Sequence, residues 1–168
     1  DGKKINMHFI LLNPGESELE NYLKMNNIPV DRVLYRGKKD ILKSIRAVYI
    51  ILKKQKSNIV HAHLFDGSII GITAAWLLRI KKRIYTRHHS NYHHNYFPHA
   101  VKYDKLVNSL STDIIAISQV VKEILIEKEN VPEEKIHLIH HGFELNDFKT
   151  VPESSINKLR QKYINGNS

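Results

Sequence analysis

With 168 residues, of which 42% are hydrophobic, the chain has the length and composition of one folded domain with a single core, which excludes a disordered tail. Its 26 Lys and Arg exceed its 17 Asp and Glu and give a net charge of +9, which favours an anionic partner such as a phosphate, a nucleotide, nucleic acid or an acidic membrane surface. Because the chain has no cysteine, disulfides, thiolate metal sites and thiol nucleophiles are excluded.

The longest apolar run, from Ile69 to Leu78, is too short for a membrane-spanning helix, which needs about 18 residues. The first residues, DGKKINMHFILLNPGE, have only a brief apolar run followed by a turn and do not resemble a signal peptide. We therefore expect a cytoplasmic protein, and one that can also lie peripherally at the inner face of the cell membrane.

The first third of the chain predicts alternating strands and helices. The apolar run 4–13 indicates a strand that ends in an Asn-Pro-Gly turn. A helix is expected over 16–25, where acidic residues near the start suit the helix dipole, and a short strand is expected over 31–35. Over 41–55, apolar residues recur at helical spacing with lysines and arginines mostly elsewhere, which predicts an amphipathic helix that covers a sheet.

Three further units repeat the order of strand then helix. The expected strands are 58–64, 83–89, 113–118 and a last one at 135–142, and the expected helices are 66–79, 98–110 and 119–129. Ser118 stands at the N-cap position of the third of these helices. The alternation predicts an α/β fold, a Rossmann-like parallel sheet with helices on both faces. After Gly142 we expect a loop over 143–155 and a short terminal helix over 156–164.

One feature of doubly wound folds is missing from the sequence. Such folds commonly begin with a strand that feeds a glycine-rich, phosphate-binding turn, whereas this sequence starts on a strand and has no GxGxxG or phosphate-loop pattern. Either the phosphate is bound in another way, or the sequence lacks the first strand and its glycine-rich loop.

Histidines follow several of the predicted strands. Ligands of open parallel sheets bind beyond the carboxyl ends of the strands, so one rim could be formed by His61, His63, His88, His89, Ser118, His140, His141 and Gly142. Because side chains alternate along a strand, His61 and His63 should share a face, as should Thr86 and His88. We expect His61, which lies inside its strand, to be buried with satisfied hydrogen bonds, and His88, nearer the strand end, to be functional.

The segment 84–100 holds five of the eleven histidines and raises the question of a metal site. We expect His93, His94 and His99, which lie in a loop and helix start among aromatic residues, to form a solvated or acceptor-lining surface. The HAHLFD segment is similar to the His-x-His clusters of zinc hydrolases, but Asp66 is displaced from that pattern and the ligand set is incomplete. We therefore predict no bound metal.

Two long stretches resemble a known family. NIVHAHLFDGSIIGITAAWLLRIKKRIYTRHHS and STDIIAISQVVKEILIEKENVPEEKIHLIHHGFE resemble the N-terminal domain of family-4 glycosyltransferases of the GT-B fold, with the same order of elements over nearly the whole chain. In that family two Rossmann-like domains face each other across a cleft. The first receives mainly the acceptor and the second the nucleotide-sugar, and the sugar is transferred with retention of configuration, generally without a metal.

The resemblance implies roles for individual residues. His88 is similar to the cleft histidine beside the transferred sugar, and we expect it to be the catalytic residue. Ser118 and the segment from Gly142 to Glu144 resemble the rim that approaches the donor, where the family often has Asn-Gly-Val-Asp and this sequence has His-Gly-Phe-Glu. The expected substrate-binding residues are His63, Thr86, His89, Ser118, Gly142 and Glu144.

The resemblance also implies a division of the chain and a reaction. Residues 1–148 would be the Rossmann-like N-terminal domain, truncated at its start, and 149–168 a linker and short helix leading to an absent C-terminal donor domain. The complete protein would be a retaining, hexosyltransferase-like glycosyltransferase that needs no cofactor. It would move a sugar from a nucleotide-sugar donor to a sugar or lipid-linked sugar acceptor, and this chain alone would be inactive.

Other partners follow from the charge and the sheet edges. The basic helix 41–56 could rest on anionic lipid head groups, although a solvated helix face is the more common interpretation. No nucleic-acid motif is present, so we expect no nucleic-acid partner for the enzyme. A missing central strand would leave two exposed edges and favour self-association. The alternative function is a non-catalytic domain that binds an anionic ligand, such as phosphate, a nucleotide or nucleic acid, in a basic cleft.

Overall fold

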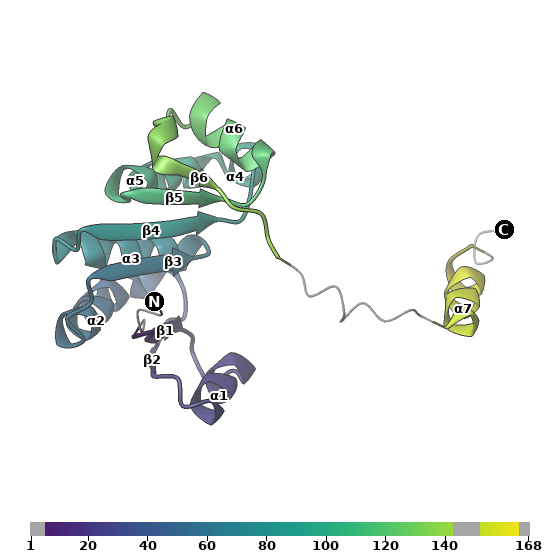
Figure 1. Ribbon diagram of the computed structural model, residues 1–168, viewed down its shortest axis with the longest axis horizontal. Coiled ribbons are helices and arrows are strands. Elements are labelled where there is room, and N and C mark those ends of the chain that lie inside the picture. Colours follow the sequence, from purple (N-terminus) through teal and green to yellow (C-terminus); the bar gives the residue numbers. More distant parts are fainter. Residues whose placement is uncertain (1–5, 143–151, 165–168) are drawn as a thin grey trace, which may run out of the picture.

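The computed structural model describes residues 6–142 and 152–164 (Figure 1). Its strands are β1 (Phe9–Leu12), β2 (Val30–Val33), β3 (Ile59–His63), β4 (Lys82–Arg87), β5 (Asp113–Ala116) and β6 (Ile136–Leu138). Its α-helices are α1 (Glu18–Met25), α2 (Ile41–Lys54), α3 (Phe65–Leu77), α4 (Tyr92–Tyr96), α5 (Val101–Leu110), α6 (Gln119–Glu127) and α7 (Glu153–Ile164). Short 3₁₀ helices cover Lys38–Asp40, Pro98–Ala100 and Glu133–Lys135.

All of these strands pair in parallel. The strands β1 and β2 form a two-stranded sheet, and the order β3-β4-β5-β6 forms a four-stranded sheet. The register places His63 opposite Thr86 and Arg87 opposite Ala116, so neighbouring strands end at the same edge. The predicted α/β fold with a Rossmann-like parallel sheet is confirmed.

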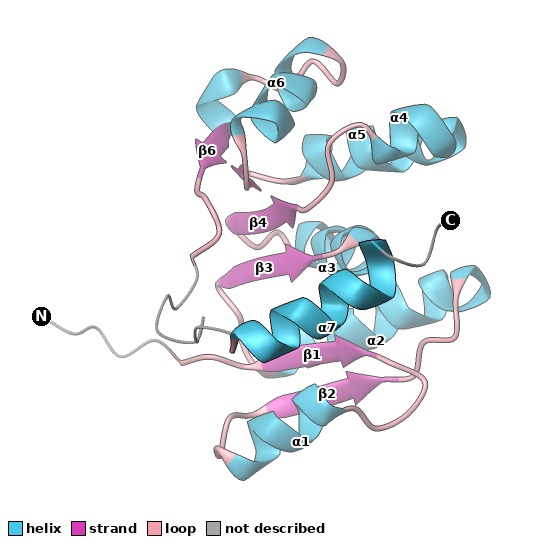
Figure 2. Cartoon of the chain, turned by 90° about the vertical axis from the view of Figure 1, so that its right-hand side faces the viewer, coloured by secondary structure: helices cyan, strands magenta, loops and turns pink. Residues whose placement is uncertain are grey.

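The two sheets turn one edge toward each other. In Figures 1 and 2, β1 is the strand of its pair that lies nearer to β3. Within residues 6–142 and 152–164, no backbone ladder joins β1 to β3, so each of them keeps an unpaired edge. The absence of the family's first strand stays a prediction. Such a strand would concern these two edges.

The connections determine which face each helix covers. Right-handed crossovers that step from β3 to β6 in one direction place α3, α5 and α6 on one face, and these helices share one buried apolar cluster over the sheet. The step from β1 to β2 runs the other way, which places α1 on the opposite face. Within the described segments, no helix is both long and apolar enough to cross a membrane.

The apolar run of α3 is explained by its central position. Ile69 and Ile72 pack into the cluster shared with α5 and α6, whereas Ile70 and Ala74 pack into a second cluster with α2, Val33 of β2 and Val60 of β3. A helix that packs on two sides must be apolar around most of its circumference. One continuous apolar layer therefore supports both sheets.

Most predicted element boundaries are confirmed within a few residues. The predicted N-cap is also confirmed, because the Ser118 side chain accepts a hydrogen bond from the backbone N–H of Val121 at 3.3 Å. The terminal helix, α7, begins slightly earlier than expected. One α-helix was not predicted, since α4 forms where we expected a loop, and the 3₁₀ helices Lys38–Asp40 and Glu133–Lys135 were not predicted either.

Candidate functional site

The carboxyl ends of β3, β4 and β6 bring four imidazoles together, which we call the histidine row: His61, His63, His88 and His141. His61 Nε2 lies 2.8 Å from Thr86 Oγ1, and His63 Nδ1 lies 3.3 Å from His88 Nε2. The ring centres of His88 and His141 are 5.6 Å apart. The two pairs of side chains expected to share a face therefore do so. His61 makes the expected hydrogen bond, but it is exposed, so the prediction that it is buried is wrong.

Three imidazoles of the histidine row favour the neutral form. Partial desolvation lowers the pKa of His61, His63 and His88 below the ordinary value, and the neighbouring imidazoles lower the pKa of His61 and His88 further. A neutral imidazole offers one hydrogen-bond donor and one acceptor. The row can thus bind hydroxyl groups of a sugar as well as phosphate oxygens.

The backbone between β3 and α3 is strained. Leu64 has φ 63° and ψ 168°, a backbone conformation that residues other than glycine rarely adopt. Its carbonyl accepts the first-turn hydrogen bond from Ser68 N at 2.9 Å, and its side chain is 69% exposed. Such strain costs about 1–3 kcal/mol and is concentrated at functional sites.

A cavity of about 290 Å³ opens beside the histidine row. Its walls come from the start of α3, the end of β4, α4 and α5, and they include Phe65, Ser68, His88, His89, Tyr92 and His93. Small-molecule pockets usually measure about 300–1,000 Å³, so this cavity is large enough for one small group of a ligand.

Below this cavity lies a cluster that we call the buried ion network: Arg87, His93, His94, Asp104 and Glu129. The guanidinium of Arg87 donates from Nη1 to Asp104 Oδ1 at 2.8 Å and from Nη2 to Glu129 Oε1 at 2.6 Å. These three side chains are at most 4% exposed. Buried charges need partners of this kind, because each ion loses its hydration.

The network also fixes the segment that follows β4. Arg87 Nε donates to the carbonyl oxygen of His89 at 3.0 Å, which holds the backbone on both sides of His88. His93 Nδ1 lies 2.6 Å from Asp104 Oδ2, and His94 Nε2 lies 3.1 Å from Glu129 Oε1. Of the two expected surroundings of His93, the solvated surface is wrong, because the carboxylate holds the ring inward and the residue is 7% exposed. His93 lines the cavity, so a role in lining the acceptor site stays a prediction.

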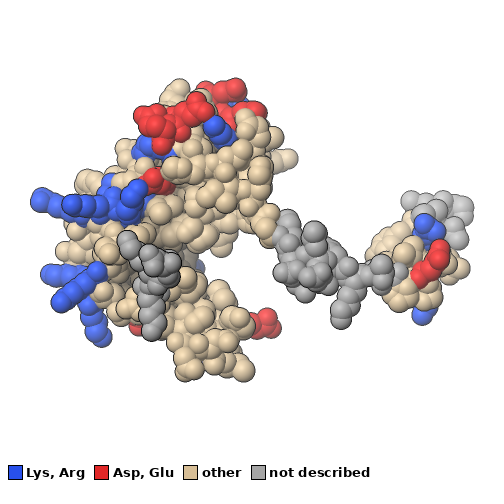
Figure 3. Space-filling model, viewed as in Figure 1, with Lys and Arg blue, Asp and Glu red and all other residues tan. Residues whose placement is uncertain are grey.

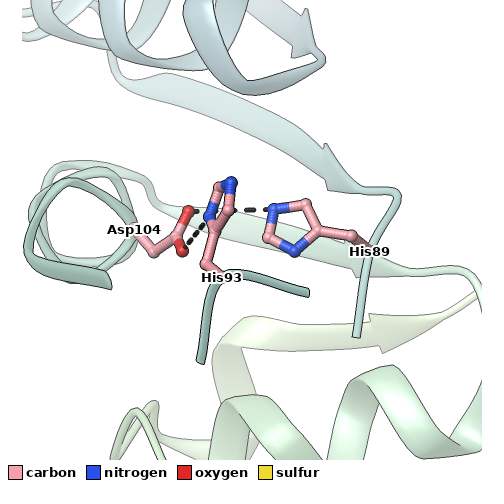
Figure 4. A group of neighbouring side chains, drawn as sticks. All are labelled: His89, His93 and Asp104. Atoms are coloured by element: carbon pink, nitrogen blue, oxygen red, sulfur yellow. Dashed lines mark hydrogen bonds and ion pairs between the residues drawn. The ribbon is translucent and has the colours of Figure 1, made fainter. Parts of the chain in front are cut away.

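His89, His93 and Asp104 come close enough for a metal ion to be considered (Figure 4). One ligand atom from each lies within 4.8 Å of the others, and burial with the nearby Arg87 charge lowers the pKa of His89 to about 4, so its ring is neutral. However, Arg87 occupies the same carboxylate at 2.8 Å, and a cation bound there would be repelled by the guanidinium. The arrangement fits an ion pair better than a metal, and the expected absence of a metal stays a prediction.

The remaining predicted site residues lie in different places. Thr86 is buried beneath the histidine row, and the side chain of Ser118 caps the N-terminus of α6. Gly142 is exposed beside His141, and Glu144 lies outside the described residues. The structure thus brings His63, Thr86 and His88 together, while His89 faces the buried ion network.

Sequence reasoning missed the carboxylates of the network. Asp104 and Asn108 stand one helical turn apart on the face of α5 that also buries Val107. A carboxylate on an apolar helix face must find a buried cation, and that pattern was the available signal. Asn108 Nδ2 donates to Glu129 Oε2 at 2.7 Å and completes the set.

A group of six exposed lysines and arginines lies at the opposite edge of the fold, which we call the basic edge. Its members are Lys53, Lys54, Lys56, Arg79, Lys81 and Lys82, and all are exposed. They lie where α2 and α3 end and β4 begins, and Figure 3 shows Lys and Arg projecting from the side where the strands start. The histidine row lies where the strands end, so the cations of the basic edge do not line the cavity.

A protein-family comparison identifies the chain. The model of Glycosyltransferase Family 4 matches residues 3–147. The chain belongs to this family. As a family-4 domain with a parallel Rossmann-like sheet, it is the N-terminal domain of a GT-B fold. No curated protein shows significant sequence similarity to it.

Solved structures show the same fold at low sequence identity. HepE from Anabaena, in complex with UDP, matches with a TM-score of 0.62 and 19% identity over 91% of this chain and 41% of the other. A glycosyltransferase from Rickettsia africae matches with a TM-score of 0.56, 22% identity, and coverage of 92% and 40%. A UDP-GlcNAc 2-epimerase from Methanocaldococcus jannaschii matches with a TM-score of 0.55, 17% identity, and coverage of 71% and 34%. The chain thus spans less than half the length of these proteins.

Proposed function

We propose that this domain is the acceptor half of a retaining, hexosyltransferase-like glycosyltransferase. The donor would be a nucleotide-sugar and the acceptor a sugar or a lipid-linked sugar. The observation that carries the proposal is the histidine row at the strand ends, beside a small cavity. Membership of Glycosyltransferase Family 4 and the UDP bound to HepE support the reaction class and the donor.

His88 is the proposed catalytic residue. It lines the cavity, His63 holds its ring through the 3.3 Å contact between Nδ1 and Nε2, and Arg87 fixes the backbone next to it. A hydrogen bond from an imidazole held in this way becomes stronger when charge develops on the reacting sugar. His88 would therefore act mainly on the transition state. His63, Thr86, His89, Ser118, Gly142 and Glu144 are the proposed substrate-binding residues.

The donor diphosphate would be bound mainly by a second domain. This chain covers 41% of the HepE chain. On this proposal the chain by itself does not turn over a nucleotide-sugar, and the complete protein needs no metal or other cofactor.

Steady-state kinetics of the full-length protein tests the role of His88. We expect His88→Ala to lower kcat by about a hundredfold, as loss of one preorganised donor does elsewhere, with little change in donor binding. His99→Ala, which alters an exposed histidine of the same segment, is the matched control and should leave kcat unchanged. A folded His88→Ala variant with wild-type kcat would show that another residue carries the reaction.

The basic edge supports a peripheral contact with the cytoplasmic face of an anionic membrane. Besides its cations, α3 exposes Trp76 and Leu77 near the same end, at 49% and 50%. Basic and aromatic side chains side by side are typical of membrane interfaces. We expect co-sedimentation with phosphatidylglycerol vesicles and not with phosphatidylcholine vesicles, and loss of it in Lys53→Glu/Lys81→Glu, since each cation contributes about 1 kcal/mol. Equal binding to both vesicles would contradict this contact.

A further inference from the structure

His93 has one ring nitrogen engaged and one free. Its Nδ1 lies 2.6 Å from Asp104 Oδ2, whereas no hydrogen bond to its Nε2 is found among residues 6–142 and 152–164. Figure 4 shows the second nitrogen turned away from Asp104. The side chain lines the cavity beside the histidine row and packs edge-on against Phe65, with ring centres 4.6 Å apart. A buried imidazole with an unused nitrogen at a cavity wall needs a polar partner.

The partner of Nδ1 determines the chemistry of Nε2. Burial raises the pKa of Asp104, while Arg87 and the hydrogen bond from His93 lower it. A carboxylate only accepts hydrogen bonds, so Nδ1 is the protonated nitrogen, and in the neutral tautomer Nε2 carries the lone pair. Asp104 is itself fixed, because Arg87 holds its other oxygen at 2.8 Å and is held in turn by Glu129 at 2.6 Å. His93 therefore presents a rigid hydrogen-bond acceptor, and a hydroxyl or N–H group is the complement.

The charges beneath the cavity select among ligand groups. Asp104 and Glu129 are two carboxylates beside a single guanidinium, that of Arg87, and burial lowers the pKa of His89 to about 4, so its ring adds no charge at pH 7. The surplus negative charge disfavours a phosphate or carboxylate. The aromatic wall formed by Phe65 and Tyr92 suits the apolar face of a sugar ring.

We propose that Nε2 of His93, oriented by Asp104, accepts a hydrogen bond from a hydroxyl group of the acceptor sugar. The inference rests on the proposed function and assigns a second histidine to it. His88 acts on the transferred sugar from the histidine row, whereas His93 binds the acceptor from the other side of the cavity. His93 is thus a specificity-determining residue, and Asp104, which acts through it, is a positioning residue.

His93→Asn in the full-length protein is the decisive variant. The Asn amide keeps an N–H group near the position of Nδ1 for Asp104 but has no atom in place of Nε2. We expect kcat/KM for the acceptor to fall about tenfold, mainly through KM, with donor KM unchanged, as for loss of one hydrogen bond to a neutral ligand. His99→Asn should have no effect. A purely structural role for His93 predicts wild-type acceptor KM in a folded His93→Asn protein, and that result would overturn the proposal.

A measurement on this chain separates the proposal from the proposed function. In ¹⁵N NMR spectra at pH 7, His93 should show protonated Nδ1 and unprotonated Nε2, and the Nε2 resonance should shift when methyl glycosides of glucose, galactose or N-acetylglucosamine are added. Protonation at Nε2, or no shift with any of the three glycosides, would overturn the inference about His93. If the full-length wild-type protein transferred no sugar from any nucleotide-sugar, the proposed function would fail instead, whatever the NMR result.

Discussion

Replacing Arg87 by Met tests whether the buried ion network holds the end of β4 in place. The guanidinium lies between Asp104 at 2.8 Å and Glu129 at 2.6 Å, and none of the three side chains is more than 4% exposed. Met preserves most of the unbranched stem but removes the positive charge. Two buried carboxylates would then remain without their cation. The side chains near them in the described part of the chain are His93, His94, Asn108 and, at 3.9 Å from Asp104 Oδ1, His89.

The expected cost is large for a domain of this size. Removing one partner of a buried ion pair costs about 3–5 kcal/mol, a substantial part of a total stability of about 5–15 kcal/mol. One kcal/mol shifts Tm by about 2–4 °C in a domain of this length, so Tm at pH 7 should fall by about 6–20 °C. Burial already raises the pKa of Asp104 above its ordinary value and Arg87 lowers it, so without Arg87 that pKa rises further. The deficit is therefore present at neutral pH and becomes smaller as pH falls and Asp104 takes up a proton.

Lys82→Met is the matched control, because it removes a cation from an exposed pair. Lys82 Nζ lies 3.3 Å from Asp113 Oδ2, and the lysine side chain is 59% exposed. Exposed pairs contribute about 0–1 kcal/mol, so this variant should melt close to the wild type. Both variants are compared by thermal melts followed by circular dichroism at neutral and mildly acidic pH. If Arg87→Met melted within about 3 °C of the wild type at pH 7, the network would not stabilise the fold as argued.

Four further predictions concern stability, strain, association and metal content. The free energy of unfolding should fall as pH is lowered from 6.5 toward about 4, because His89 binds a proton in the unfolded state and stays unprotonated in the folded state. Denaturant titrations at several pH values should show this fall, and His89→Gln should make it smaller. Leu64→Gly should exceed Leu64→Ala in unfolding free energy by about 1 kcal/mol, since only glycine tolerates that backbone, and equal values would exclude strain. The free edges of β1 and β3 should cause self-association in sedimentation experiments, which a stable monomer would contradict. Elemental analysis of protein purified without added metal should show no stoichiometric zinc, and its presence would reverse our interpretation of Asp104.

The sequence predicted the fold because the strong signals in it are local. The strand around Ile59–His63 and the helix α3 follow from apolar runs of different length, and Ser118 follows from its place before an apolar helical face. The helix α4 was missed because its five residues have no apolar periodicity. In the structure, His93 and His94 of this helix contact the carboxylates of Asp104 and Glu129. Contacts between residues so far apart in the sequence leave no local pattern.

The candidate site was predictable only in part, for the same reason. The strand-end rule predicts that His63 and His88 lie together, and their nitrogens are 3.3 Å apart. The same rule gives no information on Glu129, whose partner Arg87 lies 42 residues earlier in the chain. A buried carboxylate can be inferred from its apolar neighbours, but its cation is determined by the packing of α5 and α6 against β4.

The short sequence Thr-Arg-His-His at the end of β4 contains both halves of the site. Side chains alternate along a strand, so Thr86 and His88 turn to the histidine row, while Arg87 and His89 turn to the buried ion network. The two sets share one backbone, and Arg87 ties that backbone down through the carbonyl of His89 at 3.0 Å. A change in the network should therefore displace His88 without touching it. Arg87→Met should lower kcat as well as stability, whereas a substitution confined to the basic edge should change neither.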